Sequence, residues 1–160
     1  MHASFCHKHS MPAVMAALWI SASASAQYAT QGDAMQAIAQ SHIEANVPDA
    51  SSFDSLLRRD LAAYFHAIDP SSPSKLDYKF LRNGPTQTGV SYPKFYLWVT
   101  AKNGSSIVHE GAVRVAAVEK TRFEVTRFIS KAEILKAPQE LQSVFPAPLV
   151  APILELAKSN

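Results

Sequence analysis

The chain has 160 residues, of which 48% are hydrophobic and 18% are charged, and its formal net charge at pH 7 is +2. A chain of this length and near-neutral charge suits one ordinary folded domain, and without a basic run or a recognised nucleic-acid motif we expect no nucleic-acid partner. The single cysteine is Cys6, so the sequence excludes an intramolecular disulfide framework.

The first 26 residues have the three parts of a secretory signal peptide. Lys8 and no acidic residue precede an apolar run over 11–20, and Ala24-Ser25-Ala26 then offers a cleavage site of the A-x-A type. The run is too short for a bilayer core of about 30 Å, so a permanent anchor is the weaker interpretation. We therefore predict a signal peptide over 1–26, export to the periplasm or the outside of the cell, no membrane span after cleavage, and one α+β domain over 27–160.

Two helices are predicted ahead of the sheet. Met35, Ile38 and Ile43 recur at helical spacing and indicate a short amphipathic helix over 33–45. A second helix begins near Ser51 or Ser52 and ends before Asp69-Pro70. Its spacing defines a broad apolar face: Phe53, Leu56, Leu57, Leu61, Tyr64, Phe65 and Ile68.

Alternating apolar residues predict four strands, over 76–81, 94–100, 107–118 and 122–129. Asn103-Gly104 supplies residues that accept positive φ and predicts a two-residue hairpin turn. That turn would pair Trp98 with His109 and Tyr96 with Gly111, and it would turn Val113 away from the apolar face. A β-bulge at Gly111 would restore the apolar face, and a longer turn is the alternative.

The order helix, helix, four strands and short C-terminal helices over 138–145 and 149–158 predicts an α+β fold with an antiparallel meander. One face of the sheet is expected to pack on the second helix, through Leu76, Tyr78, Phe80, Phe95, Leu97, Val99, Val113, Val115, Phe123 and Val125. This order of elements is similar to that of cystatin-like and NTF2-like rolls. The similarity is one of element order alone, and it transfers no functional residue.

The candidate binding residues fall in a polar loop over 82–94 and on the second face of the sheet. The loop contributes Arg82, Thr86, Gln87, Thr88, Tyr92 and Lys94, and the second face contributes Tyr96, Trp98 and Arg114. Two glycines and two prolines fix the loop backbone, so it could present these groups to a partner. The alternatives are a connection that satisfies its own hydrogen bonds and a second face covered by the C-terminal helices.

The sequence predicts no catalytic or metal-binding residue and no cofactor. His42, His66 and His109 are widely spaced, and no G-x-S-x-G motif is present. Residues 75–136 contain eleven basic and five acidic side chains, which could orient an anionic partner. The favoured hypothesis is an exported, non-enzymatic binding or accessory protein for an unknown protein or small anionic ligand.

Two alternatives to that hypothesis are kept. The first is a small-molecule or enzymatic pocket between helix and sheet, using His66, Tyr78 or His109 with a nearby carboxylate. The second is a protease inhibitor of cystatin type, which needs a projecting hairpin wedge. Partner identity and oligomeric state do not follow from the sequence.

Overall fold

A computed structural model describes residues 31–70 and 73–159 of the chain. It has two helices, a four-stranded antiparallel sheet in the order β1-β2-β3-β4, and short C-terminal helices, which confirms the predicted α+β class. The elements are α1 (Gln31–Asn46), α2 (Ala50–Ile68), β1 (Lys75–Phe80), β2 (Lys94–Asn103), β3 (Ser106–Val118), β4 (Arg122–Ser130), α3 (Lys131–Lys136), the 3-10 turn η1 (Pro138–Glu140), α4 (Leu141–Val144) and α5 (Ala147–Lys158). The predicted signal peptide lies outside the described residues.

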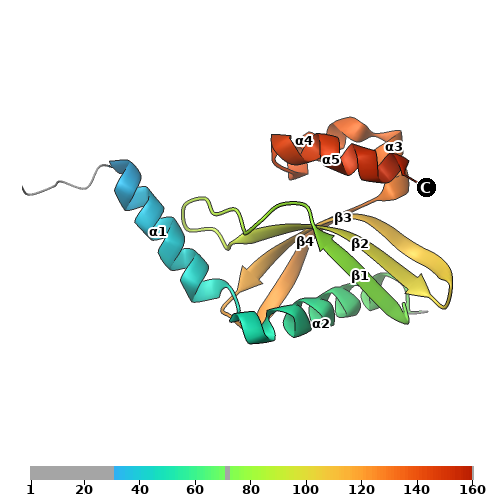
Figure 1. Ribbon diagram of the computed structural model, residues 1–160, viewed down its shortest axis with the longest axis horizontal. Helices are drawn as coiled ribbons and strands as arrows, with labels where there is room; N and C mark the ends of the chain where they lie inside the picture. Colours follow the sequence, from blue (N-terminus) through green and yellow to red (C-terminus); the bar gives the residue numbers. More distant parts are fainter. Residues whose placement is uncertain (1–30, 71–72, 160) are drawn as a thin grey trace, which may run out of the picture.

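The sheet is the middle of three layers. Figure 1 shows α2 along one face of the sheet and the group α3, α4 and α5 over the other, while α1 extends away from this body. Met35 and Ile38 on α1 are 51% and 44% exposed. These two residues of the predicted apolar stripe of α1 are therefore open to solvent, whereas Ile43 is half-buried.

The first core lies between α2 and the sheet, as the sequence predicts. Leu57, Leu61 and Phe65 of α2 are fully buried, and Phe53 makes edge contacts with the rings of Phe95 and Phe123. Each of the three buried side chains contributes about 1.5 to 3 kcal/mol by leaving water. The sheet contributes Phe95, Leu97, Val99, Val113, Val115, Ala117 and Phe123, with Leu76, Tyr78 and Val125 packed beside them.

A second core covers the other face of the sheet. Tyr96 and Trp98 are 5% and 6% exposed because α3, α4 and α5 lie over them. The helices contribute Ile134, Leu141, Phe145, Leu149, Ile153 and Ala157. The sequence leaves open whether this face is a binding surface or is covered by the C-terminal segment. In the structure the C-terminal helices cover it.

Helix α3 was not predicted, although its start has a recognisable signature. The Ser130 hydroxyl accepts a hydrogen bond from the Glu133 amide at 3.2 Å, and the Glu133 carboxylate accepts one from the Ser130 amide at 2.8 Å. This capping box lowers the pKa of Glu133, through the bonds from the Ser130 hydroxyl and amide. It turns the chain from β4 directly into the second core.

The predicted register of the β2–β3 hairpin is wrong in detail. Gly104 and Ser105 form the turn, with Gly104 at φ +60°, and Asn103 pairs with Ser106. The register then shifts between Ala101 and Lys102, which leaves Val108 as the extra residue. The bulge therefore precedes Gly111, and the inward direction of Val113 and Val115 is kept.

Gly111 has a different role from the predicted bulge. It pairs with Val99 on β2, and a Cβ atom there would lie 2.2 Å from the carbonyl oxygen of Ile129. The glycine therefore permits the close approach of β4. The partners of the two central aromatics change accordingly, so that Tyr96 faces Arg114 and Trp98 faces Ala112.

Strand β4 contains a second register shift that the alternation does not reveal. Arg114 pairs with Arg127 but Val115 pairs with Val125, so Thr126 is the extra residue. Phe128 therefore packs on the first core, where its ring meets Phe65 edge-on at 5.1 Å, whereas Ile129 joins the second core. Unbroken alternation over 122–129 predicts the opposite, with Ile129 on the same face as Phe123 and Val125 and Phe128 on the other face.

Candidate functional site

The predicted loop joins β1 to β2 and is tied to the start of β2. Thr86 forms an isolated bridge with Lys94, in which each amide bonds the other carbonyl at 2.8 and 2.9 Å. The Thr86 hydroxyl also lies 2.9 Å from the Tyr96 hydroxyl. Two of the candidate residues, Thr86 and Lys94, therefore hold the base of the loop by their backbones.

Gln87 closes the far part of the loop on itself. Its Nε2 donates to the carbonyls of Gly89 at 3.0 Å and Ser91 at 2.5 Å, and the Ser91 hydroxyl donates to the Thr88 carbonyl at 2.8 Å. Gly89 has a φ of +55°, which its lack of a side chain permits. The Gln87 Oε1 is buried and has no hydrogen-bond partner within the described chain. This part of the loop satisfies most of its polar groups internally.

The clamped loop presents a small mixed surface to solvent. Arg82 and Thr88 are exposed, Tyr92 is 43% exposed, and Val90 is 82% exposed. Val90 was not among the sequence candidates, although an apolar residue between Gly89 and Ser91 in a polar loop was a readable signal. We call Arg82, Thr88, Val90 and Tyr92 the loop surface.

The other three candidates lie away from the loop surface, beneath the C-terminal helices. The rings of Tyr96 and Phe145 are tilted against each other with centroids 5.9 Å apart, and the Trp98 Nε1 donates to Glu110 at 3.3 Å. Arg114 donates from Nη1 to the carbonyl of Val144 at 3.2 Å. These residues join the sheet to the C-terminal helices, so the structure does not bring all nine candidates onto one surface.

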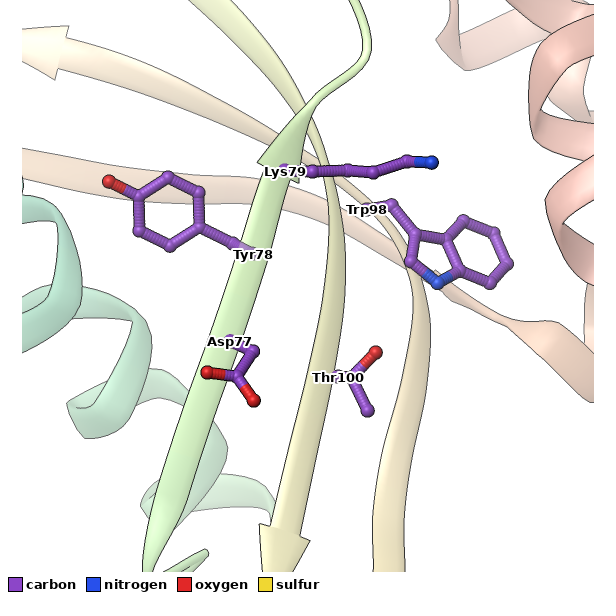
Figure 2. A pocket seen from close by; sticks show the side chains of 5 residues that line it. All are labelled: Asp77, Tyr78, Lys79, Trp98 and Thr100. Atoms are coloured by element: carbon purple, nitrogen blue, oxygen red, sulfur yellow. The ribbon is translucent and has the colours of Figure 1, made fainter.

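Three of the hollows on the described surface are lined without any residue of α2. The first, of about 200 Å³, lies along β1 and β2; Figure 2 shows its lining residues, Asp77, Tyr78, Lys79, Trp98 and Thr100. The second, of about 400 Å³, separates the end of β1 from α5. The third, of about 570 Å³, lies over α5 and the residue Gln142. All three are open, and the space between α2 and the sheet is filled by the first core.

The titratable groups of the alternative enzymatic hypothesis do not share one of these hollows. His109 stacks on Phe65 with ring centroids 5.3 Å apart, and its Nε2 lies 3.8 Å from Asp69. His66 is exposed on α2. Tyr78 lines the first hollow, but its hydroxyl bonds Asp54 at 2.5 Å.

Tyr78, Asp54 and Arg58 form one electrostatically coupled group. Partial burial, together with the bond to the Asp54 carboxylate, raises the pKa of Tyr78 to about 12. The same bond, and a second one from Arg58, lower the pKa of Asp54. The Arg58 guanidinium also lies 4.9 Å from the centre of the Tyr78 ring. This group braces α2 against the edge of the sheet.

Within the described residues, no cluster of three or more histidine, cysteine, aspartate or glutamate side chains is arranged to hold a metal ion. None of the described helices is long and apolar enough to cross a membrane. Comparison with protein-family models, with curated proteins and with solved structures yields no match for this chain. Function must therefore be argued from the surfaces themselves.

Proposed function

We propose that the chain is an exported, non-enzymatic binding or accessory protein that contacts a partner protein through the loop surface. The observation that carries this proposal is the combination of a loop held by its own hydrogen bonds and an apolar tip left in water. Gln87 and Thr86 fix the backbone, while Val90 is 82% exposed. A loop ordered before binding loses less conformational entropy on association.

The loop surface has the composition of a small protein-binding patch. Tyrosine and arginine are enriched in interfaces, and both are exposed on this loop as Tyr92 and Arg82, together with the apolar Val90. Arg82 gives the patch a positive charge, which suits an acidic site on the partner. The space between α2 and the sheet is filled by side chains, which favours binding at the loop surface over binding in an interior pocket.

Site-specific photo-crosslinking in the producing cell tests the loop surface. A photoreactive amino acid at position 92 should trap the partner, whereas the same group at position 107 should not. Ile107 is the matched control because it is 54% exposed in β3, in the hairpin at the other end of β2. The trapped protein is then identified by mass spectrometry.

The binding measurement uses the identified partner and exposed side chains only. Val90→Ser with Tyr92→Ala should weaken binding at least tenfold, because truncating an interface anchor costs about 2 kcal/mol or more. Ile107→Ser should leave the affinity unchanged. Equal crosslinking at both positions, or equal affinities of the two variants, would contradict the proposal.

Export is a separate part of the proposal, with its own test. It rests on the order of Lys8, the apolar run and Ala24-Ser25-Ala26. The protein purified from the cell envelope or the medium should have the intact mass of a chain beginning at Gln27. A full-length chain recovered only from the cytoplasm would disprove export without bearing on the loop surface.

A further inference from the structure

Strand β1 forms an edge of the sheet, and its backbone directions are fixed by two contacts. The Leu81 amide donates to Tyr96 of β2 at 2.9 Å, so positions 75, 77 and 79 also direct their backbone groups toward β2. Leu76, Tyr78 and Phe80 direct theirs outward. Arg58 Nη1 bonds the outward carbonyl of Leu76 at 2.8 Å, in agreement with this alternation.

The sequence of this edge is complementary to itself. When two β1 strands are placed antiparallel with Tyr78 opposite Tyr78, Leu76 lies opposite Phe80 and Asp77 lies opposite Lys79. The outward residues 76, 78 and 80 then form the hydrogen-bonded pairs. Asp77 and Lys79 occupy the other kind of pair, in which opposed side chains come closest.

Neighbouring registers lack this complementarity. A shift of two residues in one direction places Asp77 opposite Asp77, and the same shift in the other direction places Lys79 opposite Lys79. Like charges directly opposite each other destabilise a strand pair. Among these three registers, the charges therefore favour the one centred on Tyr78.

The side chains involved are accessible in the described structure. The Asp77 side chain is 47% exposed and pairs with Lys75 at 3.3 Å, while Phe80 is 42% exposed. In Figure 2, Asp77 and Lys79 lie along the open hollow, and Tyr78 points away from Lys79. A second strand would therefore meet the charged pair on one face and Leu76 and Phe80 on the other.

We propose that a second copy of this chain binds at β1, so that the two sheets join antiparallel about a two-fold axis at Tyr78. The pairing exchanges the Arg58 bond at Leu76 for a bond from the Phe80 amide of the second copy. Pairing releases the Arg58 contact and joins strands of only six residues, so the dimer is weak. It should therefore dissociate on dilution. The two proposals are tested at different residues, Asp77 and Lys79 on β1 and Val90 and Tyr92 in the loop, so the failure of one is distinguishable from the failure of the other.

Sedimentation velocity over a range of concentrations tests the pairing on the full chain. Asp77→Lys and Lys79→Asp should each weaken dimerisation at least tenfold, because two attractive pairs per dimer become repulsive. The double variant should restore it, since opposite charges face each other again. Lys136→Asp, an exposed charge change on α3, should have no effect.

A disulfide experiment tests the register directly, in chains with Cys6→Ser. Mixing an Asp77→Cys chain with a Lys79→Cys chain should give a disulfide-linked pair under mild oxidation, and each alone should give several-fold less. A chain that stays monomeric at every concentration would overturn the proposal. So would a dimer insensitive to both single charge changes, or a double variant that fails to recover.

Discussion

At the scale of single residues, Tyr78 has two structural roles: its side chain contacts α2, and its backbone forms part of the sheet edge. Its hydroxyl bonds Asp54 on α2, its ring lies under Arg58, and its backbone faces outward from the sheet edge. Mutual stabilisation explains why the pKa of Tyr78 rises and that of Asp54 falls, since the phenol donates to a carboxylate that is also bonded by a guanidinium.

The shifted pKa of Tyr78 gives a pH prediction. The folded pKa of about 12 exceeds the ordinary value of 10.0, so stability from this group is present below pH 10 and is lost as the pH rises toward 12. The difference in phenolate absorbance between the chain and Tyr78→Phe should show a titration near pH 12. Asp54→Asn should move that titration toward 10, and a midpoint already at 10 in the unsubstituted chain would contradict the contact.

At the scale of elements, the β3–β4 turn depends on a residue from α1. Glu119 and Lys120 have φ values of 50° and 59°, in the left-handed region that non-glycine residues rarely adopt. The Asn46 side chain accepts from the Glu119 amide at 3.1 Å, and the Asn46 carbonyl accepts from the Lys120 amide at 2.9 Å. Asn46 is 7% exposed, so the acceptor side of these bonds is buried.

Asn46→Ala should therefore lower the free energy of unfolding by about 1 to 3 kcal/mol, because it leaves the partly buried Glu119 amide without its acceptor. Urea denaturation measures this change. Gln40→Ala is the matched control on α1, since it removes only an exposed bond to Glu44. Equal midpoints for the two variants would show that the turn does not need Asn46.

The four strands and α2 are the elements that the sequence predicted best. Period-two alternation assigned the four strands, and helical spacing assigned α2 and the face on which it packs, because both patterns record burial directly. Alternation cannot show where a bulge changes its parity, which is why Phe128 and Ile129 were assigned to the wrong faces. The sequence left the cover of Tyr96 and Trp98 open because it depends on how α3 turns the chain.

The candidate site, like the fold, was predictable in part: the loop was recognised, but the residue at its exposed tip was not. The polar loop stood out by composition, and its clamp by Gln87 agrees with the alternative that the loop satisfies its own hydrogen bonds. Val90 was overlooked because its signal, one apolar residue within a polar loop, is compositional and carries no periodicity. The exposure of Val90 follows from the turn that Gly89 allows, a property of the folded backbone.

At the scale of the whole molecule, β2 couples the two cores. Leu97 and Val99 lie in the first core, whereas Tyr96 and Trp98 lie in the second, so alternate residues of one strand serve both. Neither layer of helices can separate from the sheet without exposing one side of β2. Unfolding should therefore be a single cooperative transition for α2, the sheet and the C-terminal helices.

Ile153→Ala tests this coupling from the side far from α2. Ile153 is fully buried in the second core, and its truncation should cost about 2 to 5 kcal/mol. With Trp19→Phe in the background, Trp98 is the only tryptophan, so its fluorescence reports the second core while circular dichroism reports helices on both faces. The two signals should shift together in urea. The control Leu135→Ala, at a residue 51% exposed on α3, should change the free energy from neither signal by more than about 0.5 kcal/mol.

An earlier transition of Trp98 alone would mean that the C-terminal helices detach first. Tyr96 and Trp98 would then become available to a partner, as the second-face prediction requires.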